Sequence, residues 1–331
     1  MILLRIFKND RELGTMAIIL LLIAVYVPSF IDAFSTDGVS LTPYTCMPLY
    51  QLIFGAIHKV PVLNHLVAML ITMLIAITLI RIGIRDQLLE RRSLMPAVFF
   101  ILFTAALPGA RQVSPALISS LFYMLCFMIL FEVHDKNPDT LSIFTASLIL
   151  VLGSMFCLKL IWFVPLIWIS LWTMRQLTLR EILYPVIAYV LLALFLYTWF
   201  WGIRGNAAGF MELVRENMAI KGSFEPYHNS VYYLYAYFLL LVFIASIHMI
   251  DRFQSRKSIV QNIYQVMFYM FLAGILYLFF VLRFEPTGLV YIAVPVAFIL
   301  SNYFHRKRNP WIHELAMWIL LGLVVYVQLM V

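Results

Sequence analysis

Long apolar runs constrain this chain more than any other feature, because eleven of them fill most of its 331 residues. They cover roughly residues 14–31, 62–80, 94–109, 116–131, 140–158, 160–174, 182–201, 231–250, 263–282, 288–302 and 311–331. A helix needs about 20 apolar residues to cross the hydrocarbon core of a bilayer. Several runs are shorter, and tilting or partial insertion accommodates the difference. The runs predict a polytopic integral membrane protein with about 11 transmembrane helices.

Composition excludes the other classes of protein. Hydrophobic residues make up 64% of the chain and charged residues 12%, whereas a soluble domain is about 25% charged. So much apolar surface would find no core in a soluble domain, and a disordered chain needs low hydrophobicity. No run has the two-residue alternation of a barrel strand. Because only helices and closed barrels satisfy the backbone in lipid, we expect an all-α transmembrane domain over residues 1–331, with no soluble domain.

Basic residues predict the orientation of the chain. With the N-terminus cytoplasmic, 16 of the 23 Lys and Arg residues fall in inner segments and 7 in outer segments. This bias follows the positive-inside rule and puts the C-terminus in the periplasm. The basic residues lie in short loops rather than in one patch, so nucleic acid is not an expected partner.

The first long outer stretch, residues 32–61, carries two carboxylates. Asp32 and Asp37 follow the first apolar run. Segment 47–60 is apolar but too short to cross, which predicts an interfacial or re-entrant helix. A carboxylate above such a helix can act as a base or hold a divalent cation against a lipid pyrophosphate. The alternative is that these Asp residues cap helices and keep the loop hydrated. The cofactor therefore stays open, with a divalent cation as one candidate.

The second long outer stretch, residues 202–230, predicts an amphipathic helix on the membrane surface. Phe210, Leu213, Val214 and Met218 share one helical face. Basic side chains in the outer segments can bind a lipid phosphate headgroup, and Arg can do so with two parallel hydrogen bonds. The candidate lipid-phosphate ligands are Arg111, Lys159, Arg204, Arg215, Lys221 and Arg283. The alternative for these side chains is ordinary anchoring at the membrane boundary.

Several mechanisms lack their sequence signals. The chain has no phosphate-binding G-x-x-x-x-G-K-[ST] loop, no H-E-x-x-H and no G-x-S-x-G. Its seven histidines show no metal-ligand spacing, so no metal site is predicted. The apolar runs hold almost no ionisable groups, which disfavours a charge-coupled transporter.

Two resemblances add to these observations. The stretch RQLTLREILYPVIAYVLLALFLYTWFW at 175–201 resembles an uncharacterised family of Bacteroidota multi-pass inner-membrane proteins, which implies the bacterial inner membrane. The order of parts over residues 14–201 is similar to the membrane module of GT-C glycosyltransferases: a span, an outer acidic loop, juxtamembrane helices and further spans. That resemblance implies that Asp32 or Asp37 is the catalytic carboxylate and that outer cations hold a polyprenyl-phosphate donor. The chain departs from it in having no Asp-x-Asp pair.

Three functions remain open at this point. The first is a lipid-linked glycosyltransferase, or a relative of one, acting at the periplasmic face in envelope glycan assembly. The second is a non-catalytic scaffold or assembly subunit of an envelope complex, and the third is a lipid or glycan translocator. Whether the protein is an enzyme thus stays undecided by sequence. Membrane lipids are the expected partners, and no protein partner is predicted.

Overall fold

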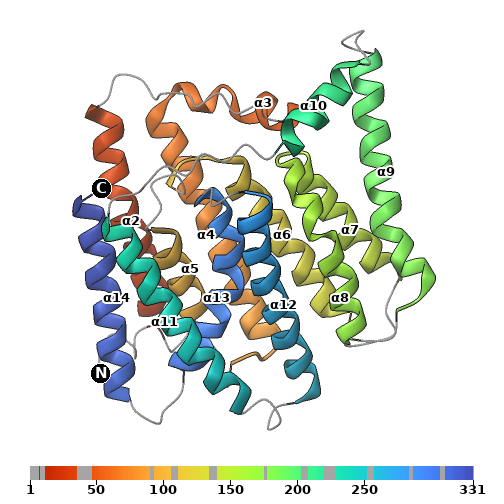
Figure 1. Ribbon diagram of the computed structural model, residues 1–331. Coiled ribbons are helices and arrows are strands. Elements are labelled where there is room, and N and C mark those ends of the chain that lie inside the picture. The colour runs from red at the N-terminus through yellow and green to blue at the C-terminus, as the bar shows by residue number, and fades with distance from the viewer. Residues whose placement is uncertain are drawn as a thin grey trace.

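The protein folds as a bundle of helices in a computed structural model (Figure 1). The structure describes residues 7, 12–35, 47–89, 93–105, 111–133, 140–174, 177–202, 208–219, 229–251, 257–282, 286–305 and 310–330. Within these residues every regular element is helical, and no strand occurs. This agrees with the all-α membrane protein that hydropathy predicts, because helices satisfy their backbone groups without water.

Eleven helices overlap the eleven apolar runs one for one in the described part of the chain. They are α2 (Glu12–Ser35), α4 (Pro61–Arg85), α5 (Met95–Ala105), α6 (Pro115–Glu132), α7 (Thr140–Ser154), α8 (Val164–Met174), α9 (Leu179–Gly202), α11 (Asn229–Asp251), α12 (Ser258–Phe280), α13 (Leu289–Phe304) and α14 (Pro310–Met330). The connecting elements are α3 (Pro48–Phe54), η1 (Ile57–Lys59), η3 (Leu158–Phe163), α10 (Ala208–Met218) and η5 (Pro286–Gly288).

Seven of the described helices are long and apolar enough to cross a membrane, by length and composition: α2, α4, α6, α9, α11, α12 and α14. The apolar segments of α5, α7, η3 with α8, and α13 are shorter. At about 1.5 Å per residue, the 11 residues of α5 extend about 16 Å, roughly half of the hydrocarbon core. The count of eleven complete crossings therefore remains a prediction.

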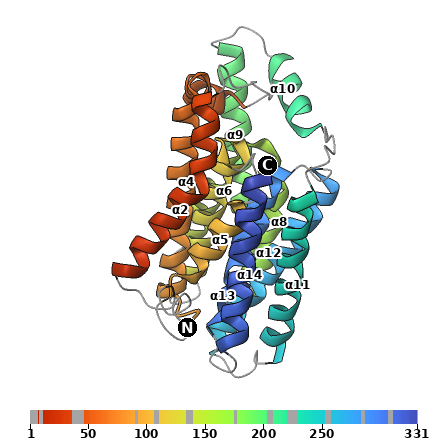
Figure 2. The ribbon, with the colours of Figure 1, turned by 90° about the vertical axis from the view of Figure 1, so that its left-hand side faces the viewer.

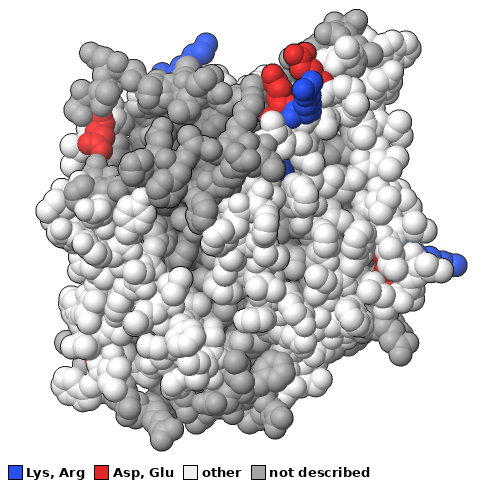
Figure 3. All heavy atoms as spheres, viewed as in Figure 1, with Lys and Arg blue, Asp and Glu red and all other residues white. Residues whose placement is uncertain are grey.

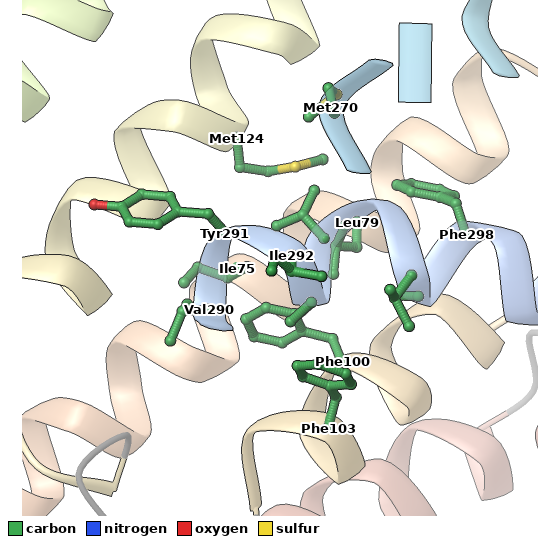
Figure 4. Close-up of a cluster of buried hydrophobic side chains, with 14 of the residues drawn as sticks. Ile75, Leu79, Phe100, Phe103, Met124, Met270, Val290, Tyr291, Ile292 and Phe298 are labelled. Atoms are coloured by element: carbon green, nitrogen blue, oxygen red, sulfur yellow. The ribbon is translucent and has the colours of Figure 1, made fainter. Parts of the chain in front are cut away.

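The two short helices α5 and α13 form the centre of the bundle. Every side chain from Met95 to Thr104 and from Val290 to Ser301 is buried. Helices that are apolar all round are expected inside a large helical protein, and here they pack on each other. Figure 4 shows Ile75 and Leu79 of α4, Phe100 of α5 and Phe298 of α13 within this core.

Consecutive helices among the eleven that overlap the apolar runs point in opposite directions, so their connections gather at two ends. Figures 1 and 2 show α2 running toward the end that carries α10, which we name the upper end. Helix α14 also runs toward the upper end. The first and last described long helices therefore point the same way, as an odd number of antiparallel passes requires.

Helix α10 packs on protein instead of leaving its apolar face for lipid. Its residues Phe210, Leu213, Val214 and Met218 lie against a cluster formed by Met47, Val151, Leu158, Ala188, Leu192 and Leu196. Phe210 contacts Tyr197 of α9, with ring centroids 6.1 Å apart. The amphipathic pattern thus predicts the helix, but its apolar face joins α10 to α9 and η3 at the upper end.

Candidate functional site

Residues 111–114 lead into α6 at the upper end and form a turn that we name the Arg111 turn, and side chains from α3 and α4 satisfy its backbone. The Nδ1 atom of His65 donates to the carbonyl oxygen of Arg111 over 2.7 Å. The amide of Val113 donates to Oδ1 of Asn64 over 2.9 Å, and the Tyr50 hydroxyl donates to the carbonyl of Val113 over 3.0 Å. Buried backbone groups need such partners, so this turn is held in one conformation.

Local sequence explains why these residues meet. Pro61 begins α4, where a missing N–H is tolerated, and this puts Asn64 and His65 within its first two turns. Ser114 caps α6 by accepting a hydrogen bond from the amide of Leu117, and Pro115 occupies the first turn. The starts of α4 and α6 thereby flank the Arg111 turn.

The side chain of Arg111 is buried, and one of its guanidinium donors has no partner among the described residues. It is 6% exposed, and its Nε has no hydrogen-bond partner among the described residues. Burial lowers the pKa of the guanidinium from its ordinary value, and the neighbouring Tyr26 and Asp32 oppose this shift. An Arg side chain stays protonated through such shifts. A buried cation with unused donors can receive an anion such as a phosphate through charge-assisted hydrogen bonds.

Asp32 lies near Arg111 in space, although the two are far apart in sequence. It is exposed near the C-terminal end of α2, and its charge acts on the Arg111 guanidinium. One helical turn and a half below it, the Tyr26 hydroxyl lies 2.9 Å from Oγ1 of Thr72 in α4. The α2–α4 contact therefore includes one buried polar pair, Tyr26 and Thr72, below the upper end. The structure thus brings together two of the residues that the sequence singles out, Asp32 and Arg111.

The other predicted site residues lie elsewhere. Lys159 is half-buried on η3, and Arg215 is exposed on α10. Figure 3 shows acidic and basic side chains gathered over α10, whose charged residues are Glu212, Arg215 and Glu216. Four further predicted residues lie outside the described residues: Asp37, Arg204, Lys221 and Arg283. In the described part of the chain, no group of three or more His, Cys, Asp or Glu side chains could hold a metal ion.

Three residues of the site are not predicted by any sequence motif. Tyr50, Asn64 and His65 carry no motif and do not match a ligand spacing. The one available signal is the adjacent pair Asn64-His65 at the start of a long apolar run. Both are buried, at 1% and 6% exposure, and buried polar side chains in a membrane span are functional candidates by default.

The fold and this site define a multi-pass helical membrane protein with a buried cation at one end of the bundle. Sequence comparison then identifies the family. A model of the family of unknown function DUF6427 matches residues 39–331, and the chain belongs to that family. No curated protein and no solved structure matches the chain.

Proposed function

We propose that this protein is a bacterial inner-membrane glycosyltransferase of the GT-C type that uses a lipid-linked polyprenyl-phosphate donor at the periplasmic face. The observation that supports it best is the buried Arg111 guanidinium, whose Nε is without a partner among the described residues, beside Asp32. A cation and a carboxylate at the end of a membrane bundle match the two tasks of such an enzyme, which are to hold a phosphate and to engage an acceptor.

Arg111 binds the donor phosphate in this proposal. Its planar guanidinium group can donate two parallel hydrogen bonds to phosphate oxygens, and burial strengthens each of these bonds. Because the turn is fixed by His65 and Asn64, the guanidinium is placed before the ligand arrives. The cations Lys159, Arg204, Arg215, Lys221 and Arg283 are proposed as further contacts to the lipid phosphate at the same end.

Asp32 engages the reacting groups. Its carboxylate can accept a hydrogen bond from an acceptor hydroxyl or hold a divalent cation against the phosphate. Asp37 follows on the same stretch of chain and is proposed for the same role. Helix α3 supports an interfacial location for the site, because Leu52 and Ile53 expose apolar side chains beside it.

Sidedness follows from the basic residues. The segments that the positive-inside count assigns to the periplasm include the Arg111 turn and residues 32–61. Donors on polyprenyl phosphate carry their own activation in the sugar–phosphate bond, so transfer at this face needs no nucleotide.

Charge-removing variants test the proposal. Asp32→Asn and Arg111→Met should each abolish an envelope-glycan product while protein level in the membrane stays constant. Glu212→Gln is the matched control, since it removes another exposed carboxylate at the upper end. If both site variants make wild-type product, the enzyme proposal is wrong. A stable co-purifying partner together with that result would favour the scaffold, and lipid movement between leaflets would favour the translocator.

A further inference from the structure

We propose that His65 is the proton acceptor of this site, and that its Nε2 atom takes the proton from the acceptor hydroxyl during transfer. The inference rests on the proposed function, in which Asp32 then has the second of its two roles, holding a divalent cation against the phosphate, and it assigns a role to a residue outside the sequence-based candidates. It starts from one hydrogen bond, between Nδ1 of His65 and the carbonyl oxygen of Arg111.

That bond fixes which nitrogen carries the proton. A carbonyl oxygen only accepts, so Nδ1 of His65 must be the donor over 2.7 Å. In the neutral imidazole the other nitrogen, Nε2, then has a bare lone pair. Among the described residues, Nε2 makes no hydrogen bond, and the ring lies edge-on to Phe30 of α2, with centroids 6.1 Å apart.

The second histidine at this end is arranged in the opposite way. Nε2 of His58 lies 2.7 Å from the Tyr50 hydroxyl oxygen. That hydroxyl gives its single proton to the carbonyl of Val113, so Nε2 of His58 must donate. Of these two histidines, only His65 therefore presents a lone pair at Nε2.

The position of His65 also suits a base for glycosyl transfer. One side chain holds the backbone of Arg111, so the proton acceptor and the phosphate-binding cation belong to one rigid unit. Histidine is also the side chain that serves most often as a general base. The charged and titratable groups around this unit include Asp32 and Tyr26, which act on Arg111, and Tyr50 with His58, which lie on the same turn.

In the proposed transfer, the sugar moves from the phosphate to the acceptor oxygen while the acceptor proton moves to His65. The acceptor O–H bond breaks and its proton moves to Nε2 of His65. The acceptor oxygen forms a bond to the anomeric carbon of the sugar, and the bond from that carbon to the phosphate oxygen breaks. The bonding electrons leave with the polyprenyl phosphate, whose added negative charge is stabilised by Arg111. The imidazolium then returns its proton to water.

Two substitutions separate this role from a structural one. In His65→Asn the side-chain amide takes the place of Nδ1 and can still donate to the Arg111 carbonyl, but no atom replaces Nε2. The matched control His248→Asn makes the same change at a histidine of the lower end, whose Nδ1 also bonds to a backbone carbonyl, that of Ile244. The assay follows transfer from a short-chain polyprenyl phosphate bearing a radiolabelled sugar to extracted envelope material, with the full-length protein in detergent.

Base catalysis contributes about 10²- to 10⁴-fold to a rate, so we expect His65→Asn to lower kcat at least about a hundredfold. KM should change little, and the loss of rate toward acidic pH should disappear, while His248→Asn behaves as wild type. Wild-type kinetics and pH profile in His65→Asn would overturn the inference and leave the proposed function standing. An inactive wild type that also fails to bind polyprenyl phosphate would overturn both.

A measurement on the unaltered protein covers the case in which His65→Asn does not fold. Nitrogen-15 NMR of histidine-labelled protein distinguishes the two imidazole tautomers. The inference requires the proton of neutral His65 on Nδ1. A proton on Nε2 would overturn it, whatever the variant does.

Discussion

The Nδ1 atom of His65, on α4, lies 2.7 Å from the backbone carbonyl oxygen of Arg111, in the turn before α6. This contact joins the start of α4 to the turn that precedes α6. It also holds the backbone of Arg111, which is the one described residue at the upper end with a buried guanidinium and an unpartnered Nε. A turn held in this way serves binding, because it places a charge without ordering the chain when the ligand arrives.

Removing the Arg111 charge should weaken the binding of a lipid phosphate. A hydrogen bond to a charged group contributes about 1.5–3 kcal/mol, so Arg111→Met should raise the Kd for a short-chain polyprenyl phosphate by about tenfold to a hundredfold. Native mass spectrometry of the purified protein measures this. Lys257→Met removes an exposed cation at the lower end and should leave the Kd unchanged. Equal affinity in Arg111→Met and wild type would exclude Arg111 as the phosphate ligand.

The Tyr50 hydroxyl should hold α3 and η1 on the Arg111 turn. Tyr50→Phe leaves the buried carbonyl of Val113 without its donor, and such a loss destabilises by about 1–3 kcal/mol. Hydrogen exchange should therefore speed up across residues 47–59 and stay unchanged in the middle of α4. If Tyr50→Phe and wild type exchange at the same rate across residues 47–59, this hydroxyl does not anchor the segment.

Acidic pH should loosen the same segment through His58. Burial lowers the pKa of His58 from its ordinary value of 6.5. The unfolded chain thus binds the proton first as pH falls, so this contribution to stability is present above 6.5 and is lost as pH falls through the folded pKa. The melting temperature of wild type should fall between about pH 7.5 and pH 5 more than that of His58→Gln, whose amide can still donate to Tyr50. Parallel curves would contradict this assignment.

A hydrogen bond between the first and last described helices should hold them together. Nε2 of Gln328 on α14 donates to the carbonyl of Val25 in α2 over 3.2 Å. Gln328→Leu removes this donor and should destabilise the protein by about 1 kcal/mol. Thermal unfolding in detergent measures the loss, and an unchanged melting temperature would contradict it.

Sequence predicts this fold well where the information is local. Hydropathy is a property of successive residues, so each apolar run coincides with a described helix, and segment 47–60 forms α3 and η1. The central position of α5 and α13 could not be predicted, because it depends on packing. An apolar run has the same hydropathy whether lipid or protein surrounds the helix. For the same reason, the apolar face of α10 gives no sign that it packs on η3 and α9.

The candidate site is predictable only in part. Asp32 and Arg111 stand out because charges are rare beside apolar runs, but their proximity depends on how α2, α4 and α6 pack. Asn64 and His65 act through the backbone of another segment. No residue spacing encodes such contacts, so the sequence shows only a polar pair at the start of an apolar run, and the structure shows what the pair binds.

The proposed activity depends most on the side of the membrane that the upper end of the protein faces. Lys59 is exposed on η1, close to the site. Lys59→Cys, in a protein whose native cysteines are replaced, can be treated with a membrane-impermeant maleimide in cells with a permeabilised outer membrane and an intact inner membrane. Labelling without lysis of the inner membrane is the predicted result. Labelling only after lysis would place the Arg111 site in the cytoplasm and contradict the proposed periplasmic activity.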